Sequence, residues 1–275
     1  MSKEITSSED TSIKKSKLGN LDLYELRCQQ SKAQISTFGA QAISWSIADK
    51  DIFFNNPKLI NDKSKALRSG APICFPWFNK GLNWNLGKEI SPSHGPVRST
   101  DWKLNSEIVN QDYVTLGFVF DTYSHLKLPL RISVNYTLTE KALFCEFIVN
   151  NLDPAASNVF ELALHSYFAT VRPGSSKISG LKEHKEKPFV PELPIDKIFD
   201  NAANNLTVTL EGYKLSIENI GFAKSVIWHP GLTHQLTDLP QDISPVPFLC
   251  LESLTEKTEL AAGSNWLGSV CYTVS

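Results

Sequence analysis

The chain has 275 residues, of which 41% are hydrophobic and 20% charged, which is typical of a soluble globular protein. Its 27 basic and 29 acidic residues give a net charge of -2. This balance excludes nucleic acid as an expected partner, because a phosphate backbone is held mainly by clustered Lys and Arg. The sequence also lacks a run of about 18 apolar residues, so we expect no membrane partner.

The N-terminus and the cysteines predict a cytoplasmic protein. Residues 1–17 contain no apolar signal region and no small-residue cleavage site. They are rich in Ser, Thr, Lys, Asp and Glu, so we expect a flexible polar tail ahead of one domain over residues 18–275. The cysteines are scattered without a CxxC pair, which favours reduced, buried thiols over disulfides or a zinc site. They are Cys28, Cys74, Cys145, Cys250 and Cys271.

The recurrent pattern along the chain is an alternation of apolar and polar residues with a period of two, which indicates half-buried strands. A short helix is the exception, expected near residues 61–68. The predicted strands are 114–120, 130–138, 143–149, 159–168, 206–210, 213–218, 248–254 and 268–274. Many short strands between Gly, Pro, Asn and Asp turns predict a single all-β domain, an antiparallel sandwich or barrel.

Three segments interrupt this pattern. Residues 68–78 carry two prolines and therefore cannot form a central strand. Residues 80–98 form a long loop rich in Gly, Pro, Asn and Ser, and residues 183–200 are charged and contain three prolines. Long loops in compact domains are usually functional or disordered. The first two segments place His or Arg beside Gly and Pro, which favours a functional role.

Two ionisable residues lie within strongly apolar strands. His165 is either a hydrogen-bonded structural histidine or a group poised to exchange a proton near neutral pH. Glu252 must be paired or hydrogen-bonded, because a buried carboxylate otherwise costs free energy. Glu252 either forms a salt bridge to a neighbouring strand or acts as a general base whose pKa is raised by burial.

Further candidates are substrate-binding residues. His94, Arg68 and Arg98 lie in the interrupting segments, and arginine suits carboxylate or phosphate contacts, although a single arginine is often an ordinary surface charge. Asp196 could accept hydrogen bonds from sugar hydroxyls or cap a turn. Three tryptophans could pack their ring faces on a sugar or could lie in the hydrophobic core. They are Trp77, Trp84 and Trp228. Lys88 could contribute to phosphate binding, but no motif supports it.

Other chemistries lack their signatures. GxSxG, GxxxxGK[ST] and GxGxxG are all missing, which argues against a serine hydrolase, a kinase and a Rossmann enzyme. His229 and His234 are five residues apart, which does not match a metal-binding helix. We therefore expect neither a metal nor a cofactor.

An ordered set of short motifs resembles the aldose 1-epimerase (galactose mutarotase-like) family. The match is closest to its hexose-6-phosphate mutarotase branch, glucose-6-phosphate 1-epimerase, and it runs from about Leu18 to the C-terminus. The most specific motif is residues 68–78, RSGAPICFPWF. The others are GAQAISW (39–45), HGPVR (94–98), LHSYF (164–168), ID (195–196), WHP (228–230), CLE (250–252) and AGSNW (262–266).

The resemblance implies a β-supersandwich with a sugar bound in a cleft on one sheet. It implies that His165 is the general acid that protonates the ring oxygen and that Glu252 is the base that takes the anomeric hydroxyl proton. His94 would bind near the ring oxygen, and Asp196 would hold sugar hydroxyls. Arg68 and Arg98 match the arginines that separate the phosphate-sugar branch from the free-sugar branch.

The resulting hypothesis is a cofactor-independent isomerase that interconverts the α and β anomers of a hexose 6-phosphate, acting as a monomer on a small-molecule substrate. Two alternatives stay open. An aldose 1-epimerase for unphosphorylated sugars would leave the two arginines unexplained. A non-catalytic protein that binds sugar phosphates would need no acid–base pair.

Overall fold

The computed structural model describes residues 5–8, 10–80 and 92–275. Within these residues, antiparallel strands form sheets of six, eight, five and two strands. The described chain contains one α-helical turn, α1 (Tyr123–Leu126), and the short 3-10 turns η2 (Val97–Ser99), η3 (Pro173–Ser175) and η4 (Lys182–His184). The expected antiparallel all-β architecture is therefore confirmed.

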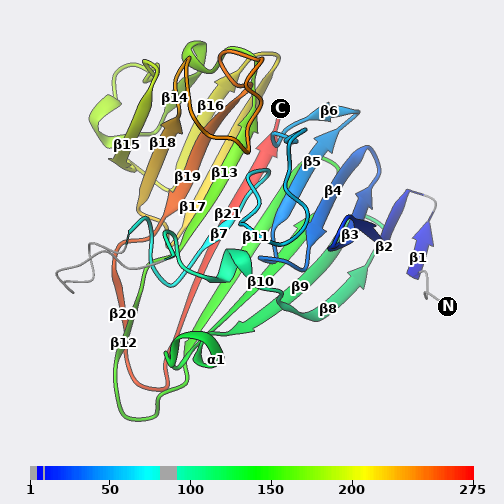
Figure 1. Ribbon diagram of the computed structural model, residues 1–275, viewed down its shortest axis with the longest axis vertical. Coiled ribbons are helices and arrows are strands. Elements are labelled where there is room, and N and C mark those ends of the chain that lie inside the picture. The colour runs from blue at the N-terminus through cyan, green and yellow to red at the C-terminus, as the bar shows by residue number, and fades with distance from the viewer. Residues whose placement is uncertain (1–4, 9, 81–91) are drawn as a thin grey trace.

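The N-terminal sheet has six strands that follow one another in sequence order. They are β1 (Ile5–Ser8), β2 (Thr11–Leu18), β3 (Leu21–Cys28), β4 (Ser31–Ser36), β5 (Ala42–Ile47) and β6 (Lys50–Asp51). Each strand pairs with the next, which is the simplest topology for short connections. In Figure 1 this sheet is the blue part of the ribbon, beside the N-terminus.

The eight-stranded sheet has the order β14-β16-β17-β21-β11-β10-β9-β8. Its members are β14 (Lys177–Ser179), β16 (Asn205–Leu210), β17 (Tyr213–Ile220), β21 (Asn265–Val274), β11 (Ala142–Asn151), β10 (Leu130–Leu138), β9 (Val114–Asp121) and β8 (Lys103–Val109). Strand β10 coincides with the prediction from its alternation, and its apolar residues are buried.

The five-stranded sheet has the order β15-β18-β19-β13-β7. It contains β15 (Ile195–Asp200), β18 (Lys224–His229), β19 (Phe248–Leu254), β13 (Ala163–Ala169) and β7 (Ile73–Cys74). The two-stranded sheet pairs β12 (Asn158–Phe160) with β20 (Thr258–Leu260). In Figure 1 most of the five-stranded sheet lies at the upper left and the N-terminal sheet at the right.

An aromatic cluster joins the three large sheets. Trp45 of β5 meets Phe53 with ring centroids 5.5 Å apart, and Phe168 of β13 meets Tyr272 of β21 at 5.3 Å. Phe53 contacts both Phe168 and Tyr272. All four rings are buried, so the N-terminal and five-stranded sheets share one core with the eight-stranded sheet.

Strand β13 is buried on both faces from Ala163 to Phe168, and the polar residues His165 and Ser166 are buried with their apolar neighbours. Phe168 and Ser166 face the eight-stranded sheet, where the Ser166 and Tyr272 hydroxyl oxygens lie 2.6 Å apart. Because side chains alternate along a strand, His165 and Tyr167 point to the opposite face. That face carries the candidate site.

Three sequence-based expectations need correction. Residues 61–68 form no helix, and residues 62–65 are bends, since Asp62 accepts a hydrogen bond from the Ser64 backbone N–H at 2.8 Å and so competes with helical pairing. The strand expected over 159–168 is divided between β12 and β13. The expected tail is also shorter than residues 1–17: β2 pairs with β3 along its whole length, and its Ile13 lies in the core.

Candidate active site

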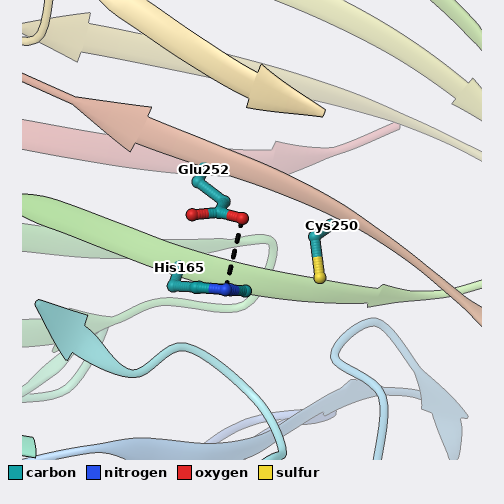
Figure 2. A group of neighbouring side chains, drawn as sticks. All are labelled: His165, Cys250 and Glu252. Carbon is teal, nitrogen blue, oxygen red and sulfur yellow. Dashed lines mark ion pairs between the residues drawn. The ribbon is translucent and has the colours of Figure 1, made fainter. Parts of the chain in front are cut away.

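His165 and Glu252 face each other across two neighbouring strands. His165 lies on β13 and Glu252 on β19, and the antiparallel register pairs them directly. Their Nε2 and Oε1 atoms are 3.3 Å apart, and the dashed line in Figure 2 marks this contact. The two most polar residues of two apolar strands are therefore brought into contact by strand pairing alone.

Burial controls the protonation of this pair. The His165 and Glu252 side chains are 9% and 2% exposed. Desolvation lowers the pKa of His165 well below 6.5, and the nearby His94, Arg98 and Arg68 lower it further. Desolvation also raises the pKa of Glu252 well above 4.5. Both shifts favour the uncharged forms, a neutral imidazole beside a protonated carboxyl group.

One polar atom of each partner remains without a hydrogen bond. Among the described residues, neither Nδ1 of His165 nor Oε2 of Glu252 has a partner, although both atoms are buried. Buried polar atoms are nearly always satisfied by protein, water or ligand. An unpaired nitrogen and an unpaired carboxyl oxygen on two side chains in contact suit a ligand that offers two neighbouring oxygen atoms.

His94 is held as a neutral hydrogen-bond donor beside the pair. Its ring centroid lies 5.6 Å from that of His165 and 4.9 Å from that of Phe78. Desolvation first, and then Arg98 and Arg68, lower the pKa of His94 to about 3. Its Nδ1 accepts the backbone N–H of Asn79 at 3.1 Å. The ring proton of the neutral form is therefore on Nε2, where it can be donated to a ligand.

The two predicted arginines act on the same groups. Arg98 follows the loop in the turn η2, and its Nη2 donates to the Ser93 carbonyl oxygen at 3.0 Å. Its charge opposes the raised pKa of Glu252 and lowers that of His165. Arg68 lies with its guanidinium carbon 5.9 Å from the centre of the Trp228 ring. The structure thus brings both arginines to the His165–Glu252 pair.

Asp196 and Trp228 border the pair on the neighbouring strands. Asp196 of β15 is paired in register with Trp228 of β18, and its charge contributes to the raised pKa of Glu252. The Trp228 ring centroid is 6.2 Å from that of His165. Partly exposed Trp228 therefore supplies the aromatic face beside the pair.

Trp77, in contrast, serves a structural role. Its indole is 4% exposed, and its Nε1 donates to the Pro92 carbonyl oxygen at 2.9 Å. It holds the far end of the long loop and has almost no open face for a sugar ring. Trp84 and Lys88 lie outside the described residues.

A metal is a poor fit to the buried donors of this site. His165, Cys250 and Glu252 place their possible ligand atoms within 4.8 Å of one another (Figure 2). A cysteine binds a metal ion as the deprotonated thiolate. Burial, followed by the charge of Glu252, raises the pKa of the Cys250 thiol well above 9.0. The neutral thiol packs instead against Tyr167 and Phe248.

A separate cavity lies on the N-terminal sheet. It measures about 470 Å³ and is lined by polar and charged side chains of the N-terminal sheet, among them Lys14, Glu25 and Lys32. None of the predicted site residues lines it. We therefore locate the site by its chemistry, because perturbed ionisable groups cluster around His165 and not around this cavity.

Two residues near the pair were not predicted from the sequence. Tyr167 stacks on His165 with ring centroids 4.9 Å apart and an interplanar angle of 13°. Asp238 pairs with Arg68, its Oδ2 lying 2.9 Å from Nε. Tyr167 could have been found from its position two residues after His165 on the same face. Asp238 has no local signal, since it lies in a turn-rich segment 170 residues from Arg68.

Comparisons with known proteins match most of this chain. The family model of aldose 1-epimerase matches residues 22–188. A protein of Escherichia coli that carries the provisional name glucose-6-phosphate 1-epimerase is 26% identical over 264 residues, which cover 88% of this chain and 85% of the relative. A relative from Salmonella typhimurium with the same provisional name is 24% identical over 269 residues, covering 88% of this chain and 86% of its own.

Solved structures show the same fold. A Salmonella typhimurium protein described provisionally as a mutarotase superimposes with a TM-score of 0.79 at 21% identity, covering 99% of this chain and 96% of its own. A galactose mutarotase-like protein from Clostridium acetobutylicum gives a TM-score of 0.74 at 15% identity, covering 98% and 99%. With the family match over more than half of the sequence, this chain belongs to the aldose 1-epimerase family. Within the described residues, no helix is long and apolar enough to cross a membrane.

Proposed function

We propose that this protein interconverts the α and β anomers of a hexose 6-phosphate, with glucose 6-phosphate as the first substrate to test. The observation that carries the proposal is the buried His165–Glu252 pair with its two unsatisfied atoms. Anomerisation needs one proton donor and one proton acceptor at adjacent oxygens, the ring oxygen and the anomeric hydroxyl. Membership of the aldose 1-epimerase family supports a sugar as the substrate.

The reaction can be written with its protons balanced. Glu252 as carboxylate takes the proton of the anomeric hydroxyl, the C1–O5 bond breaks, and O5 receives a proton from His165 as imidazolium. The aldehyde then rotates about the C1–C2 bond. In ring closure O5 returns its proton to His165 and attacks the opposite face of C1, while Glu252 protonates O1. Each such group contributes about 10²–10⁴-fold in rate.

The reactive charge state is available without proton uptake from solvent. A neutral imidazole beside a protonated carboxyl group has the same number of protons as an imidazolium beside a carboxylate. A proton shift between Nε2 and Oε1, 3.3 Å apart, converts one form into the other. Sugar oxygens at the free atoms of the pair would stabilise the charged form by hydrogen bonding.

The arginines support a phosphorylated substrate. Arg68 and Arg98 both act electrostatically on His165, so an anion bound between them would lie near the reacting atoms. The names of the relatives from Escherichia coli and Salmonella typhimurium also specify glucose 6-phosphate. Guanidinium groups bind phosphate oxygens through charge-assisted, often bidentate hydrogen bonds.

The decisive experiment is NMR magnetisation exchange between the two anomers of glucose 6-phosphate, with and without the protein, beside free glucose and galactose. We expect faster exchange for the phosphate sugar. Acceleration of free sugars alone would identify an aldose 1-epimerase and overturn the phosphate assignment. Binding of glucose 6-phosphate without faster exchange would identify a non-catalytic binding protein.

Arg68→Ala tests the phosphate contact. We expect kcat/KM for glucose 6-phosphate to fall by about 10-fold or more, because a charged hydrogen bond is worth about 1.5–3 kcal/mol. Any turnover of free glucose should change little. Arg27→Ala is the matched control, since Arg27 is exposed on the N-terminal sheet. Equal losses for both sugars would refute phosphate recognition by Arg68.

A further inference from the structure

Arg68 is held from two sides by groups that do not belong to the acid–base pair. Its Nε donates to Oδ2 of Asp238 at 2.9 Å, and its Nη1 donates to the Tyr167 hydroxyl at 3.2 Å. The Arg68 and Asp238 side chains are 26% and 18% exposed. A partly buried arginine with two directed contacts has lost most of its rotational freedom.

The backbone around this contact is fixed as well. The Asn56 side chain, itself almost fully buried, donates to the carbonyl oxygens of Arg68 and Asp238 at 2.9 and 2.8 Å. One amide group therefore ties together two segments that are far apart in the sequence. The Arg68–Asp238 ion pair forms between backbones that are already in place, which makes its geometry reproducible.

The contacts leave donors available. A guanidinium group has five N–H donors. Asp238 and Tyr167 take two of them, one on Nε and one on Nη1. Within the described residues, these two contacts do not use the remaining donors on Nη1 and Nη2, and the guanidinium carbon lies 5.9 Å from the centre of the Trp228 ring. These donors form a fork of the kind that binds two phosphate oxygens.

A carboxylate beside a phosphate site calls for an explanation, because it repels the anion. Asp238 pairs with Arg68, and Asp196 acts on Glu252 in the direction opposite to Arg98, so two negative charges accompany the two arginines. If positive electrostatic potential were the only requirement for binding phosphate, a carboxylate such as Asp238 would weaken the site. Its presence indicates that the orientation of Arg68 contributes more to binding than the repulsion removes.

We propose that Asp238 is a positioning residue for phosphate recognition, which together with the Tyr167 hydroxyl fixes Arg68 in the orientation that presents its free N–H groups to the 6-phosphate. This inference rests on the proposed function and adds a residue to it. Asp238 acts on the substrate through Arg68. Its loss should therefore change the binding of the phosphate group while the chemistry at His165 and Glu252 continues.

The test compares Asp238→Ala, Arg68→Ala and the double variant, assayed by anomer exchange of glucose 6-phosphate. We expect Asp238→Ala to raise KM about 10-fold and to leave kcat within about twofold. In the Arg68→Ala background, Asp238→Ala should cause no further loss of kcat/KM, because the residue it positions is gone. Asp242→Ala is the matched control, an exposed aspartate of the same segment.

Two further variants keep the test decisive. Asp238→Asn keeps an oxygen acceptor for Nε with nearly the same shape, so it should fold if Asp238→Ala does not, with KM raised about threefold. Tyr167→Phe keeps the ring under His165 and removes the other Arg68 contact, so KM should again rise while kcat changes little.

Three results would overturn the inference: unchanged KM in Asp238→Ala, a fall in kcat as large as the rise in KM, or additive losses in the double variant. Failure of the proposed function has a different signature, since the wild-type protein itself would not accelerate glucose 6-phosphate exchange. In that case the same variants are compared by calorimetric binding of glucose 6-phosphate. Wild-type-like binding by Asp238→Ala would then overturn the role of Asp238.

Discussion

At the scale of single residues, the central feature is a pair of ionisable groups kept uncharged by burial. Moving His165 and Glu252 out of water disfavours the charged form of each, which shifts their pKa values in opposite directions. A pair with one transferable proton between them is suited to donate at one substrate atom while it accepts at another. The cost of burying both groups is the kind of local destabilisation that active sites often show.

His165→Asn and Glu252→Gln should each lower kcat by at least ~100-fold and leave the fold intact, because each removes one proton-transfer group and keeps a similar shape. The measurement is anomer exchange, with calorimetric binding of glucose 6-phosphate to establish that the substrate still binds. His125→Asn, far from the pair on α1, is the control. A variant with wild-type kcat would remove its residue from the mechanism.

The pH dependence of kcat should be bell-shaped. A second proton enters the pair when pH falls through the lowered pKa of His165, so the acid limb should lie below pH 6.5. The shared proton is lost when pH rises through the raised pKa of Glu252, so the alkaline limb should lie above pH 4.5. Both limbs reduce the population that carries one transferable proton.

We would measure kcat rather than kcat/KM, because the substrate phosphate itself titrates at about pH 6. The uncatalysed exchange rate is subtracted at each pH. Glu252→Gln should lose the alkaline limb in its residual activity. A wild-type profile that does not change from acid to alkaline pH would contradict proton transfer by this pair.

Single residues differ in how well the sequence reveals them. His165 and Glu252 could be recognised because each interrupts an apolar strand, where an ionisable group needs a reason to be present. Their direct pairing across β13 and β19 required strand register, which the sequence does not specify. Asp238 could not be found at all, since its partner Arg68 becomes a neighbour through folding alone.

At the scale of elements, β13 connects the site to the core. Its register with β19 is continuous from Ala163 opposite Leu254 to Ala169 opposite Phe248. One face of the strand carries His165, while Ser166 on the other contacts Tyr272 of the eight-stranded sheet. The backbone hydrogen bonds between β13 and β19 set the position of His165. The contact between the buried Ser166 and Tyr272 hydroxyls joins β13 to the eight-stranded sheet.

Tyr272→Phe should therefore lower the free energy of unfolding by about 1–3 kcal/mol, since it leaves buried hydroxyl groups without their full set of partners. It should change kcat little, because the ladder that aligns His165 with Glu252 is untouched. Denaturant unfolding and anomer exchange measure the two quantities. Tyr123→Phe is the control, since the Tyr123 side chain is exposed. A large loss of kcat at unchanged stability would contradict this division of roles.

Elements with clean alternation were the most predictable from sequence. Strand β10 has the predicted bounds because one of its faces is buried and the other partly exposed. β13 and β12 merged into one predicted strand, because residues buried on both faces give no alternation that marks a break. The helix expected near residues 61–68 was wrong, since short polar side chains there bond to nearby backbone groups.

At the scale of the whole molecule, the arrangement of the sheets is the property that alternation cannot supply. The sequence predicts that strands exist, and their burial pattern shows which face is covered, but no local signal states which sheet covers it. The cluster around Trp45, Phe168 and Tyr272 joins residues from widely separated positions. The polar N-terminal segment illustrates the same limit, because the partner strand β3 orders it.

Deletion of residues 1–18 provides a test of that segment. Removing β2 exposes the edge of β3 and takes away the buried Ile13 and the hydrogen bond from the Thr11 hydroxyl to the Gln111 carbonyl oxygen, 3.0 Å long. An uncovered edge strand is a template for pairing with another chain. We expect a lower melting temperature and concentration-dependent association, measured by thermal unfolding and size-exclusion chromatography.

Deletion of residues 1–10 is the comparison variant. It removes β1 and its pairing with β2 but keeps β2 and the buried Ile13, so it should lower the melting temperature by less. Neither deletion touches the five-stranded sheet, so anomer exchange at low temperature should persist in both while the protein stays folded. Wild-type stability after removal of residues 1–18 would show that the segment is a dispensable tail. A large difference between the two deletions would locate the stabilising contribution in β2, because the shorter deletion removes β1 alone among the strands, whereas the longer deletion also removes the pairing of β2 with β3.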